Sequence, residues 1–266
     1  MDGAPVLCEA DGGVATITLN RPANRNSMTP DVMAAFRAAV AAAAADRTLR
    51  AVVITGRGTS FCAGADFRSA SPLPGDAPEP ASLAPYERLY ATYEPFLDVF
   101  DLPMPVVAAM NGHAVGGGFG LALVCDLRVA NREARYGANF ARLGFHSGMA
   151  ISHLLPRIVG VPLAADLLFT GRLVSGAEAA AIGLVHEAVA PEEVLATAQA
   201  KARAIAACAP EAVRLMKRSL YQGAGWDPRT AARAEAFAQA ATMGSEDARE
   251  GIRALLEKRE PRFTGR

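Results

Sequence analysis

The sequence predicts an α/β fold in which buried strands alternate with helices. Short apolar runs rich in β-branched residues, such as residues 51–55 and 105–110, are typical of buried strands. Between these runs lie segments whose apolar residues recur at helical spacing, as at 83–100. Both strands leave through glycine-rich segments. This alternation favours layers of strands and helices joined by crossover connections.

Composition and charge exclude several classes of partner. The 266 residues are 51% hydrophobic, which is enough for one large core. Lysine and arginine number 27 and so do the acidic residues, which argues against nucleic acid or an anionic membrane as the main partner. No apolar run approaches the ~18 residues of a membrane span, and no signal peptide is expected. The four scattered cysteines indicate free thiols, so we expect a cytoplasmic protein with no metal.

The first hundred residues are predicted to begin with a hairpin and to contain two long helices. Asp11-Gly12-Gly13 separates the two apolar runs of the hairpin. Thr29-Pro30 supplies an N-cap and a proline at the first helical position. The expected segments are strands at 5–9 and 14–19, a polar loop at 20–27, a helix at 30–45, a strand at 51–55, a mobile proline-rich loop at 71–81 and a helix at 83–100.

The segment from Pro105 to Asp126 is the centre of the predicted architecture. It begins as a buried strand, is interrupted at Asn111-Gly112, and passes through three glycines at 116–118 into a helix at 119–124. Glycines let a ligand approach the backbone closely. The first N–H groups of a helix lack internal partners and favour an anionic atom.

The rest of the chain changes from mixed structure to helix alone. The expected segments are strands at 127–130 and 134–137, a loop at 140–148, helices at 149–159 and 163–170, a capping box at Ser175-Gly-Ala-Glu178, an extended segment at 184–189 and helices from 191 to 259. Because strands run out near this point, we divide the chain into a core at 1–195 and a C-terminal helical region at 196–266.

The two glycine-rich strand exits do not carry the usual nucleotide, metal or hydrolase motifs. The segment from Gly112 to Gly120 lacks the G-x-G-x-x-G dinucleotide pattern, and the chain has no GxxxxGK[ST] phosphate loop and no G-x-S-x-G elbow. What remains is a pair of backbone donors, one from each exit, that converge on a single oxygen. Such donors stabilise an enolate or a tetrahedral oxyanion.

Several motifs together resemble the crotonase, or enoyl-CoA hydratase/isomerase, superfamily. Segments 56–66 and 109–118 look like that family's two oxyanion-hole loops, and Asn20-Arg-Pro with Asn26-Ser-Met looks like its N-terminal motif. The resemblance covers nearly the whole chain and continues through Cys125-Asp126, Leu143-Gly144 and segments 154–160, 168–172, 179–185 and 256–263.

This resemblance implies a spiral ββα core followed by helices that mediate trimerisation, usually in a hexamer of two trimers. It implies an acyl-CoA substrate, with no cofactor beyond the CoA of that substrate. By position, the oxyanion-hole donors would be the N–H groups of Ala65 and Gly117. The implied substrate and CoA contacts are Arg25, Ala63, Gly64, Ala65, Asp66, Phe67, Arg68, Gly116, Gly117, the pocket wall Phe140, and Phe263 from a neighbouring subunit.

The sequence departs from the family where catalytic carboxylates are expected. Hydratases of this family place one glutamate two positions after the triple glycine and a second after an "FGQP" motif; here those positions hold Gly120 and Phe140. An isomerase-type carboxylate would align near Gly148. Hydration requires groups that activate water and deliver a proton. The usual two-glutamate mechanism is therefore not expected.

His146 is the candidate acid or base, because imidazole exchanges protons near neutral pH and this residue follows Leu143-Gly144. The alternative is a loop histidine bound to the backbone. Two functions stay open: an enzyme of the lyase or isomerase type that stabilises an enolate, and a CoA-thioester binding protein without hydratase chemistry. A member that cleaves a thioester or C–C bond is a more distant possibility.

Overall fold

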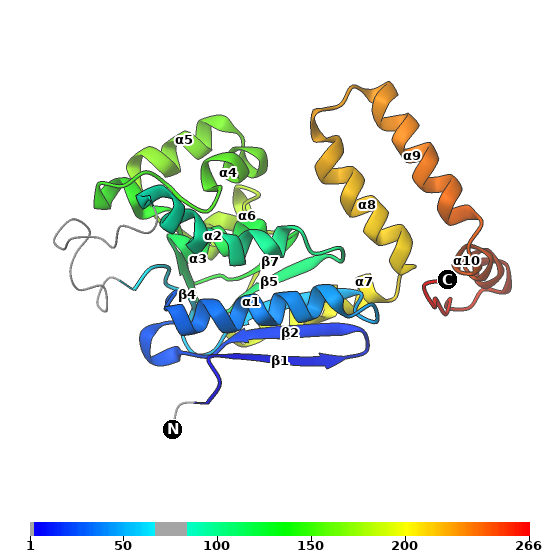
Figure 1. Ribbon diagram of the computed structural model, residues 1–266, viewed down its shortest axis with the longest axis horizontal. Helices are drawn as coiled ribbons and strands as arrows, with labels where there is room; N and C mark the ends of the chain where they lie inside the picture. The colour runs from blue at the N-terminus through cyan, green and yellow to red at the C-terminus, as the bar shows by residue number, and fades with distance from the viewer. Residues whose placement is uncertain (1–2, 67–83) are drawn as a thin grey trace.

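The computed structural model describes residues 3–66 and 84–266. The loop expected at 71–81, and the predicted contacts Phe67 and Arg68, lie outside these residues. The described residues form an α/β fold, as predicted, with two sheets and covering helices (Figure 1).

The larger sheet has six strands. Its first two form the predicted antiparallel hairpin, and the remaining neighbours pair in parallel. In spatial order the strands are β1 (Val6–Asp11), β2 (Val14–Leu19), β3 (Ala51–Gly56), β5 (Val106–Met110), β7 (Leu127–Asn131) and β10 (Glu187–Val189). Parallel neighbours require crossover connections, which place the exits of β3 and β5 at the same edge of the sheet.

A second, four-stranded sheet consists of short strands: β4 (Ser60–Cys62), β6 (His113–Val115), β8 (Arg135–Gly137) and β9 (Val174–Ser175). The chain alternates between the sheets, since β3 leads to β4, β5 to β6 and β7 to β8. This is the spiral that the family resemblance implies. Sequence analysis missed β6, because three residues next to a glycine run carry too weak a periodic pattern.

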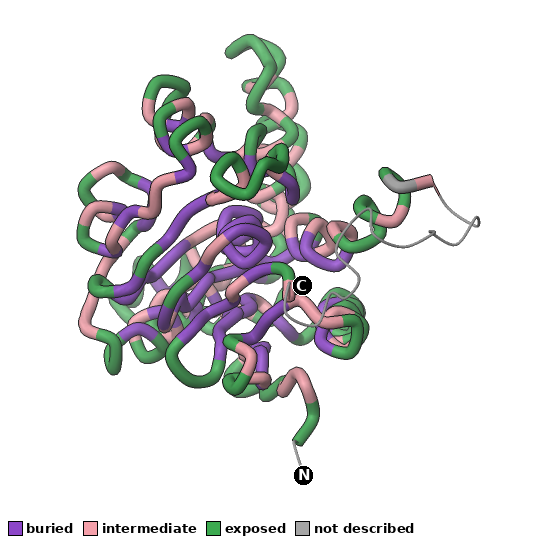
Figure 2. The backbone as a smooth tube through the Cα atoms, turned by 90° about the vertical axis from the view of Figure 1, so that its left-hand side faces the viewer, coloured by how far each residue is buried: buried purple, intermediate pink, exposed green. Residues whose placement is uncertain are grey.

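Helices cover the larger sheet, whose strands are largely buried (Figure 2). Val52 and Ile54 belong to a core with the helices at 30–45 and 85–100, whereas Ala51 and Val53 face a second core with the helix at 194–206. This alternation follows from the two-residue period of a strand. The helices of the first two hundred residues are α1 (Pro30–Ala45), α2 (Pro85–Phe100), α3 (Gly117–Val124), α4 (Ile151–Val159), α5 (Val161–Thr170) and α6 (Gly176–Ala181).

The predicted loops and caps contain short helical turns. Ser175 accepts a hydrogen bond from the Glu178 N–H, as the capping pattern indicates. Part of the loop expected at 140–148 is a 3-10 helix, because Asn139–Leu143 winds by one tight turn before Gly144. The other 3-10 helices are Pro22–Asn24, Pro191–Glu193 and Gly223–Gly225.

The C-terminal region contains α7 (Val194–Ala206), α8 (Pro210–Gln222), α9 (Pro228–Met243) and α10 (Glu246–Glu257). The division placed between residues 195 and 196 falls within α7, whose Ala198 and Ala202 pack against the sheet. Figure 1 shows α8 and α9 projecting from the sheet as a helical hairpin, with α10 at its far end. No helix in the described part of the chain is long and apolar enough to cross a membrane.

Candidate active site

The two glycine-rich loops lie against each other. A Cβ atom on Gly64, whose φ is +81°, would lie 2.7 Å from the Val115 carbonyl oxygen and 3.0 Å from the Gly117 nitrogen. A Cβ on Gly118 would overlap the Cys62 carbonyl. Only glycine permits this approach of two backbones together with the positive φ at Gly64. The chain therefore places the loop after β4 directly beside the N-terminus of α3.

The side chain of Asn111 holds the exits of β3 and β5 together. Its Oδ1 accepts a hydrogen bond from the Gly56 N–H at 3.1 Å, and its Nδ2 donates to the Gly58 carbonyl at 2.9 Å. The Asn111 carbonyl in turn accepts from Asn131 Nδ2 at 2.9 Å. Sequence analysis treated Asn111 as a strand breaker and missed this brace, because its partners lie about 55 residues away.

The segment around Arg25 supports the first loop through backbone hydrogen bonds. The Ala63 N–H donates to the Arg25 carbonyl at 3.0 Å, and the Met28 N–H donates to the Gly64 carbonyl at 2.8 Å. Arg25 and Asn26 have φ values of 59° and 55°. Left-handed backbone at non-glycine residues is strained and concentrates at functional sites.

The buried Asn26 side chain explains how that backbone is held. Its Nδ2 donates to the Ser60 carbonyl at 2.8 Å, and its Oδ1 accepts from the Arg21 N–H at 2.9 Å. The neighbouring Arg25 side chain is exposed. The predicted CoA contact Arg25 therefore lies on the outer side of the loop that contains Ala63 and Gly64.

The predicted donors, the N–H groups of Ala65 and Gly117, have no hydrogen-bond acceptor among the described residues. Gly117 is buried at the first position of α3, after Gly116, whose φ is 56°. Buried N–H groups without a partner are rare in proteins. This argument applies to Gly117, since Ala65 is exposed and its N–H is open to water; one of the two groups lies on each of the contacting loops.

Methionine side chains pack against Gly117 and against Gly120, the position at which the family resemblance implies a carboxylate. A Cβ on Gly120 would lie 2.5 Å from Met149 Cβ and 3.5 Å from Ile151 Cδ1. A Cβ on Gly117 would overlap Met28 Sδ and lie 3.4 Å from Met149 Cε. The surroundings of α3 are thus thioether and aliphatic, and a glutamate at position 120 has no space.

The second empty carboxylate position also faces the glycine loop. Phe140 is half-buried in the 3-10 helix that follows β8. Its ring carbon Cζ lies 3.7 Å from the position that a Cβ on Gly116 would occupy. Phe140 therefore lies beside the glycine loop.

His146 is exposed, and its Nδ1 lies 2.7 Å from the Ser147 carbonyl oxygen. A carbonyl only accepts, so Nδ1 carries the hydrogen and the neutral ring keeps a lone pair on Nε2. Two residues later, a Cβ on Gly148 would lie 2.6 Å from the Tyr93 hydroxyl. Sequence analysis did not consider Tyr93, because α2 is distant in sequence from this loop.

The remaining predicted residues lie in two different places. Asp66 is half-buried at the end of the first loop. Phe263 is half-buried among the C-terminal helices: its ring lies 3.4 Å from the Cβ position of Gly251, and its carbonyl accepts from Arg50 Nη2 at 2.6 Å. Within one chain, Phe263 therefore belongs to the C-terminal region.

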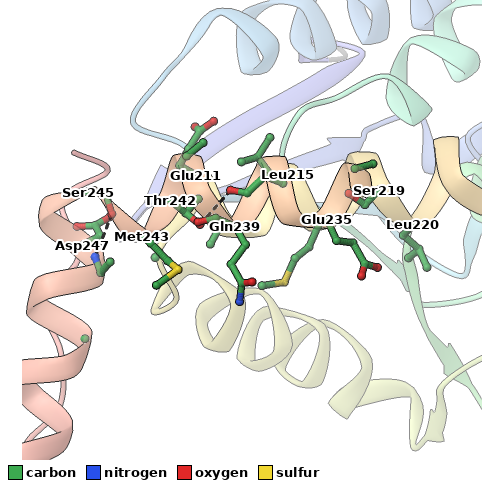
Figure 3. Close-up of a pocket in the computed structure, with 18 of the residues that line it drawn as sticks. Glu211, Leu215, Ser219, Leu220, Glu235, Gln239, Thr242, Met243, Ser245 and Asp247 are labelled. Carbon is green, nitrogen blue, oxygen red and sulfur yellow. Dashed lines mark hydrogen bonds between the residues drawn. The ribbon is translucent and has the colours of Figure 1, made fainter. Parts of the chain in front are cut away.

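A cavity of about 970 Å³ lies elsewhere, between α8, α9 and α10 (Figure 3). Its lining combines apolar side chains such as Leu215, Leu220 and Met243 with Glu211 and Glu235. None of its lining residues comes from the two glycine loops. Among the residues placed in the structure, no three His, Cys, Asp or Glu side chains gather as a metal site.

Comparisons with known proteins show which family the chain resembles. The sequence pattern of the enoyl-CoA hydratase/isomerase family matches residues 9–266. The chain is 38% identical over 265 residues to enoyl-CoA hydratase domain-containing protein 2, mitochondrial, of Bos taurus, covering 97% of this chain and 87% of that protein. It is 33% identical over 266 residues to (E)-benzylidenesuccinyl-CoA hydratase of Thauera aromatica, covering 98% and 99%.

A solved structure shows the same architecture. The crystal structure of an enoyl-CoA hydratase from Bacillus anthracis superposes with a TM-score of 0.89 at 32% sequence identity, covering 98% of this chain and 100% of that one.

Proposed function

The chain belongs to the enoyl-CoA hydratase/isomerase family, whose members act on CoA thioesters, and we propose that it polarises an acyl-CoA carbonyl with the N–H groups of Ala65 and Gly117. The observation that carries this proposal is the pair of N–H groups without acceptors on two contacting glycine loops. Each such donor is worth about 3 kcal/mol in the transition state of enzymes that use one.

The proposed chemistry proceeds through an enolate rather than through two-glutamate hydration. Two backbone donors stabilise the negative oxygen that forms when a proton leaves the α-carbon of the thioester. Gly120 and Phe140 supply no carboxylate, and Met149 fills the space in front of Gly120. His146 is the proposed base, acting through the lone pair on Nε2. This combination favours a lyase or an isomerase, although the relatives named above carry hydratase names.

The CoA part of the substrate is proposed to lie along the outer side of the first loop. The Arg25 carbonyl accepts the Ala63 N–H and the Arg25 side chain is exposed, so its guanidinium is proposed to bind a phosphate group. Asp66, Phe67, Arg68 and Gly116 complete the proposed contacts, with Phe263 contributed by a neighbouring subunit. No cofactor other than the CoA of the substrate is proposed.

A second candidate function is a CoA-thioester binding protein without turnover. The observation that favours it is the apolar packing at Gly120, which removes one carboxylate position from the site. Incubation with crotonyl-CoA and a panel of acyl-CoA esters separates the two. Turnover that vanishes in His146→Ala supports the enzyme, tight binding without turnover of any ester supports the binding protein, and no binding at all contradicts both.

The oxyanion role is tested with Gly117→Pro and Gly117→Ala. Both variants add a Cβ against Met28, but only proline removes the N–H, and proline is otherwise tolerated at the first helical position. We expect Gly117→Pro to lower turnover of an accepted acyl-CoA by about 10²- to 10³-fold, and Gly117→Ala to lower it far less. Equal activity of the two variants, measured by product formation, would contradict the role of this donor.

Assembly as a homotrimer, or as a hexamer of two trimers, is proposed from the C-terminal helices. They expose large apolar side chains, including Leu220, Phe237 and Leu256, and exposed apolar patches of this kind mark protein interfaces.

The free cysteines suit the cytoplasm, which we propose as the location of the protein.

A further inference from the structure

We propose that the Tyr93 hydroxyl is a catalytic acid of this site, delivering a proton to the enolate carbon of the bound acyl group. The proposal rests on the proposed function, since it needs an acyl-CoA thioester held by Ala65 and Gly117. It assigns to α2 a role in the chemistry of the glycine loops.

The position of the hydroxyl is set by Gly148 and Met149. A Cβ on Gly148 would lie 2.6 Å from the Tyr93 hydroxyl oxygen. The next residue, Met149, places its Cε 3.4 Å from the Cβ position of Gly117 and its Cβ 2.5 Å from that of Gly120. Consecutive Cα atoms are about 3.8 Å apart. The hydroxyl therefore lies beside Gly148, and the next residue in sequence, Met149, packs its side chain on the donor glycine.

The side chains nearest the donor glycines are apolar. The side chains that would touch a Cβ on Gly117 or Gly120 are those of Met28, Met149 and Ile151. Tyr93 is half-buried and packs against the core, yet its hydroxyl makes no hydrogen bond to any described residue. The hydroxyl oxygen keeps some exposed surface and has no hydrogen-bond partner among the described residues, so it is available to a bound substrate.

Tyrosine is among the side chains that serve as general acids. In the proposed step, the electron pair of the enolate C=C bond forms a new C–H bond with the Tyr93 proton. The thioester C=O bond re-forms and leaves the two N–H donors. The tyrosinate then takes a proton from water, and the hydroxide that remains takes from His146 the α-proton that this base removed, so protons and electrons balance over the cycle.

The matched variants are Tyr93→Phe and Tyr90→Phe. Tyr90 lies on the same helix with its side chain 55% exposed, so it controls for loss of a hydroxyl from α2. A second variant, Gly148→Ala, keeps the hydroxyl but places a methyl group against it. Each protein is incubated with butyryl-CoA in D₂O, where exchange of the α-hydrogens is followed by mass spectrometry and binding is measured separately by calorimetry.

We expect Tyr93→Phe and Gly148→Ala to slow α-hydrogen exchange by about 100-fold or more, with butyryl-CoA binding retained, and Tyr90→Phe to match wild type. Exchange in Tyr93→Phe within about twofold of wild type would overturn the assignment and leave the oxyanion hole standing. Wild type that binds butyryl-CoA without exchange would also overturn it and favour the binding protein. Wild type that binds no acyl-CoA would remove the proposed function itself.

Discussion

At the scale of single residues, the pair Gly120 and Met149 determines what chemistry the site can hold. Position 120 lies one turn into α3, where the family resemblance implies a carboxylate. Met149 has a φ of 56° and packs its Cβ against Gly120. Added volume in a filled core forces side chains and backbone to shift.

We therefore expect Gly120→Glu to destabilise the protein by about 1–3 kcal/mol without creating hydratase activity. Gly244→Glu is the control, because a Cβ at Gly244 meets no atom within 4 Å and its φ is −80°. In Gly120→Glu/Met149→Gly, a glycine at position 149 tolerates the positive φ there and frees the space beside position 120. The effects of the two substitutions on the free energy of unfolding should therefore couple by about 0.5–3 kcal/mol. Urea unfolding of wild type, Gly120→Glu, Met149→Gly and the double variant measures this coupling, with Gly244→Glu alongside, and purely additive effects would contradict direct packing.

At the scale of secondary-structure elements, a buried ion pair anchors α8 to the sheet. Lys217 Nζ lies 2.8 Å from Asp126 Oδ2, with side-chain exposures of 9% and 13%. Asp126 also accepts the Val106 N–H at 2.7 Å, at the start of β5. Sequence analysis took no account of Lys217, because its partners come from segments about 90 and 110 residues earlier.

Lys217→Met should destabilise the protein by about 3–5 kcal/mol, because it leaves the Asp126 carboxylate buried without its cation. Lys201 provides the control: its pair with Glu187 is exposed by 34% and 45%, so Lys201→Met should change stability by about 1 kcal/mol or less. Chemical unfolding of both variants tests the contrast. Equal effects would show that the buried pair does not anchor α8.

A second inter-element contact responds to acid. His186, immediately before β10, accepts the Arg128 N–H of β7 with its Nδ1 at 3.2 Å. Desolvation, together with the positive charges of Arg128 and Lys201, lowers the pKa of His186 below its usual value. The unfolded chain therefore takes up a proton below about pH 6.5 that the folded chain resists, and stability falls as pH falls through this range.

We expect His186→Asn, whose amide oxygen can accept the same N–H, to lose less stability between pH 7.5 and pH 5 than wild type does. His153→Asn, at an exposed position on α4, controls for histidine loss alone. The urea midpoint at the two pH values is the measurement. A wild-type slope in His186→Asn would refute the contribution of this ring.

The sequence predicted those elements that are marked by turn, proline or capping residues within a few positions. The β1–β2 hairpin, the start of α1 at Pro30 and the Ser175 cap follow from residues beside them, although the predicted Thr29 cap makes no side-chain capping hydrogen bond. The glycine loops also stood out, because glycine reports a backbone constraint. Met149 over Gly120, Tyr93 beside Gly148 and the Asn111 brace could not be predicted, since each depends on packing between distant segments.

At the scale of the whole molecule, the C-terminal helices expose large apolar side chains that nothing else in the described part of the chain covers. Leu255 and Leu256 on α10 are 77% and 78% exposed, and Phe237 on α9 is 81% exposed. The tail nevertheless is well held, because Asp247 accepts the N–H groups of Thr264 and Gly265 at 2.7 and 2.9 Å. An ordered but uncovered apolar surface is expected where another copy of the chain docks.

Leu256→Glu should therefore shift the protein from trimer or hexamer toward monomer, since it places a charge in an apolar contact. Ala38→Glu, at an exposed position on α1, is the control. Light scattering after size-exclusion chromatography gives the mass of each variant. A wild type that elutes as a monomer would contradict the proposed assembly.

The packing of Met149 over Gly120 also sets an order of events in evolution. From this chain, a glutamate can return at position 120 only after position 149 has become small, because the reverse order passes through a protein with overlapping side chains. Each step alone lowers stability and neither alone yields a new activity. We therefore expect a carboxylate at position 120 to be gained only with difficulty, because Met149 occupies the space that this side chain would need.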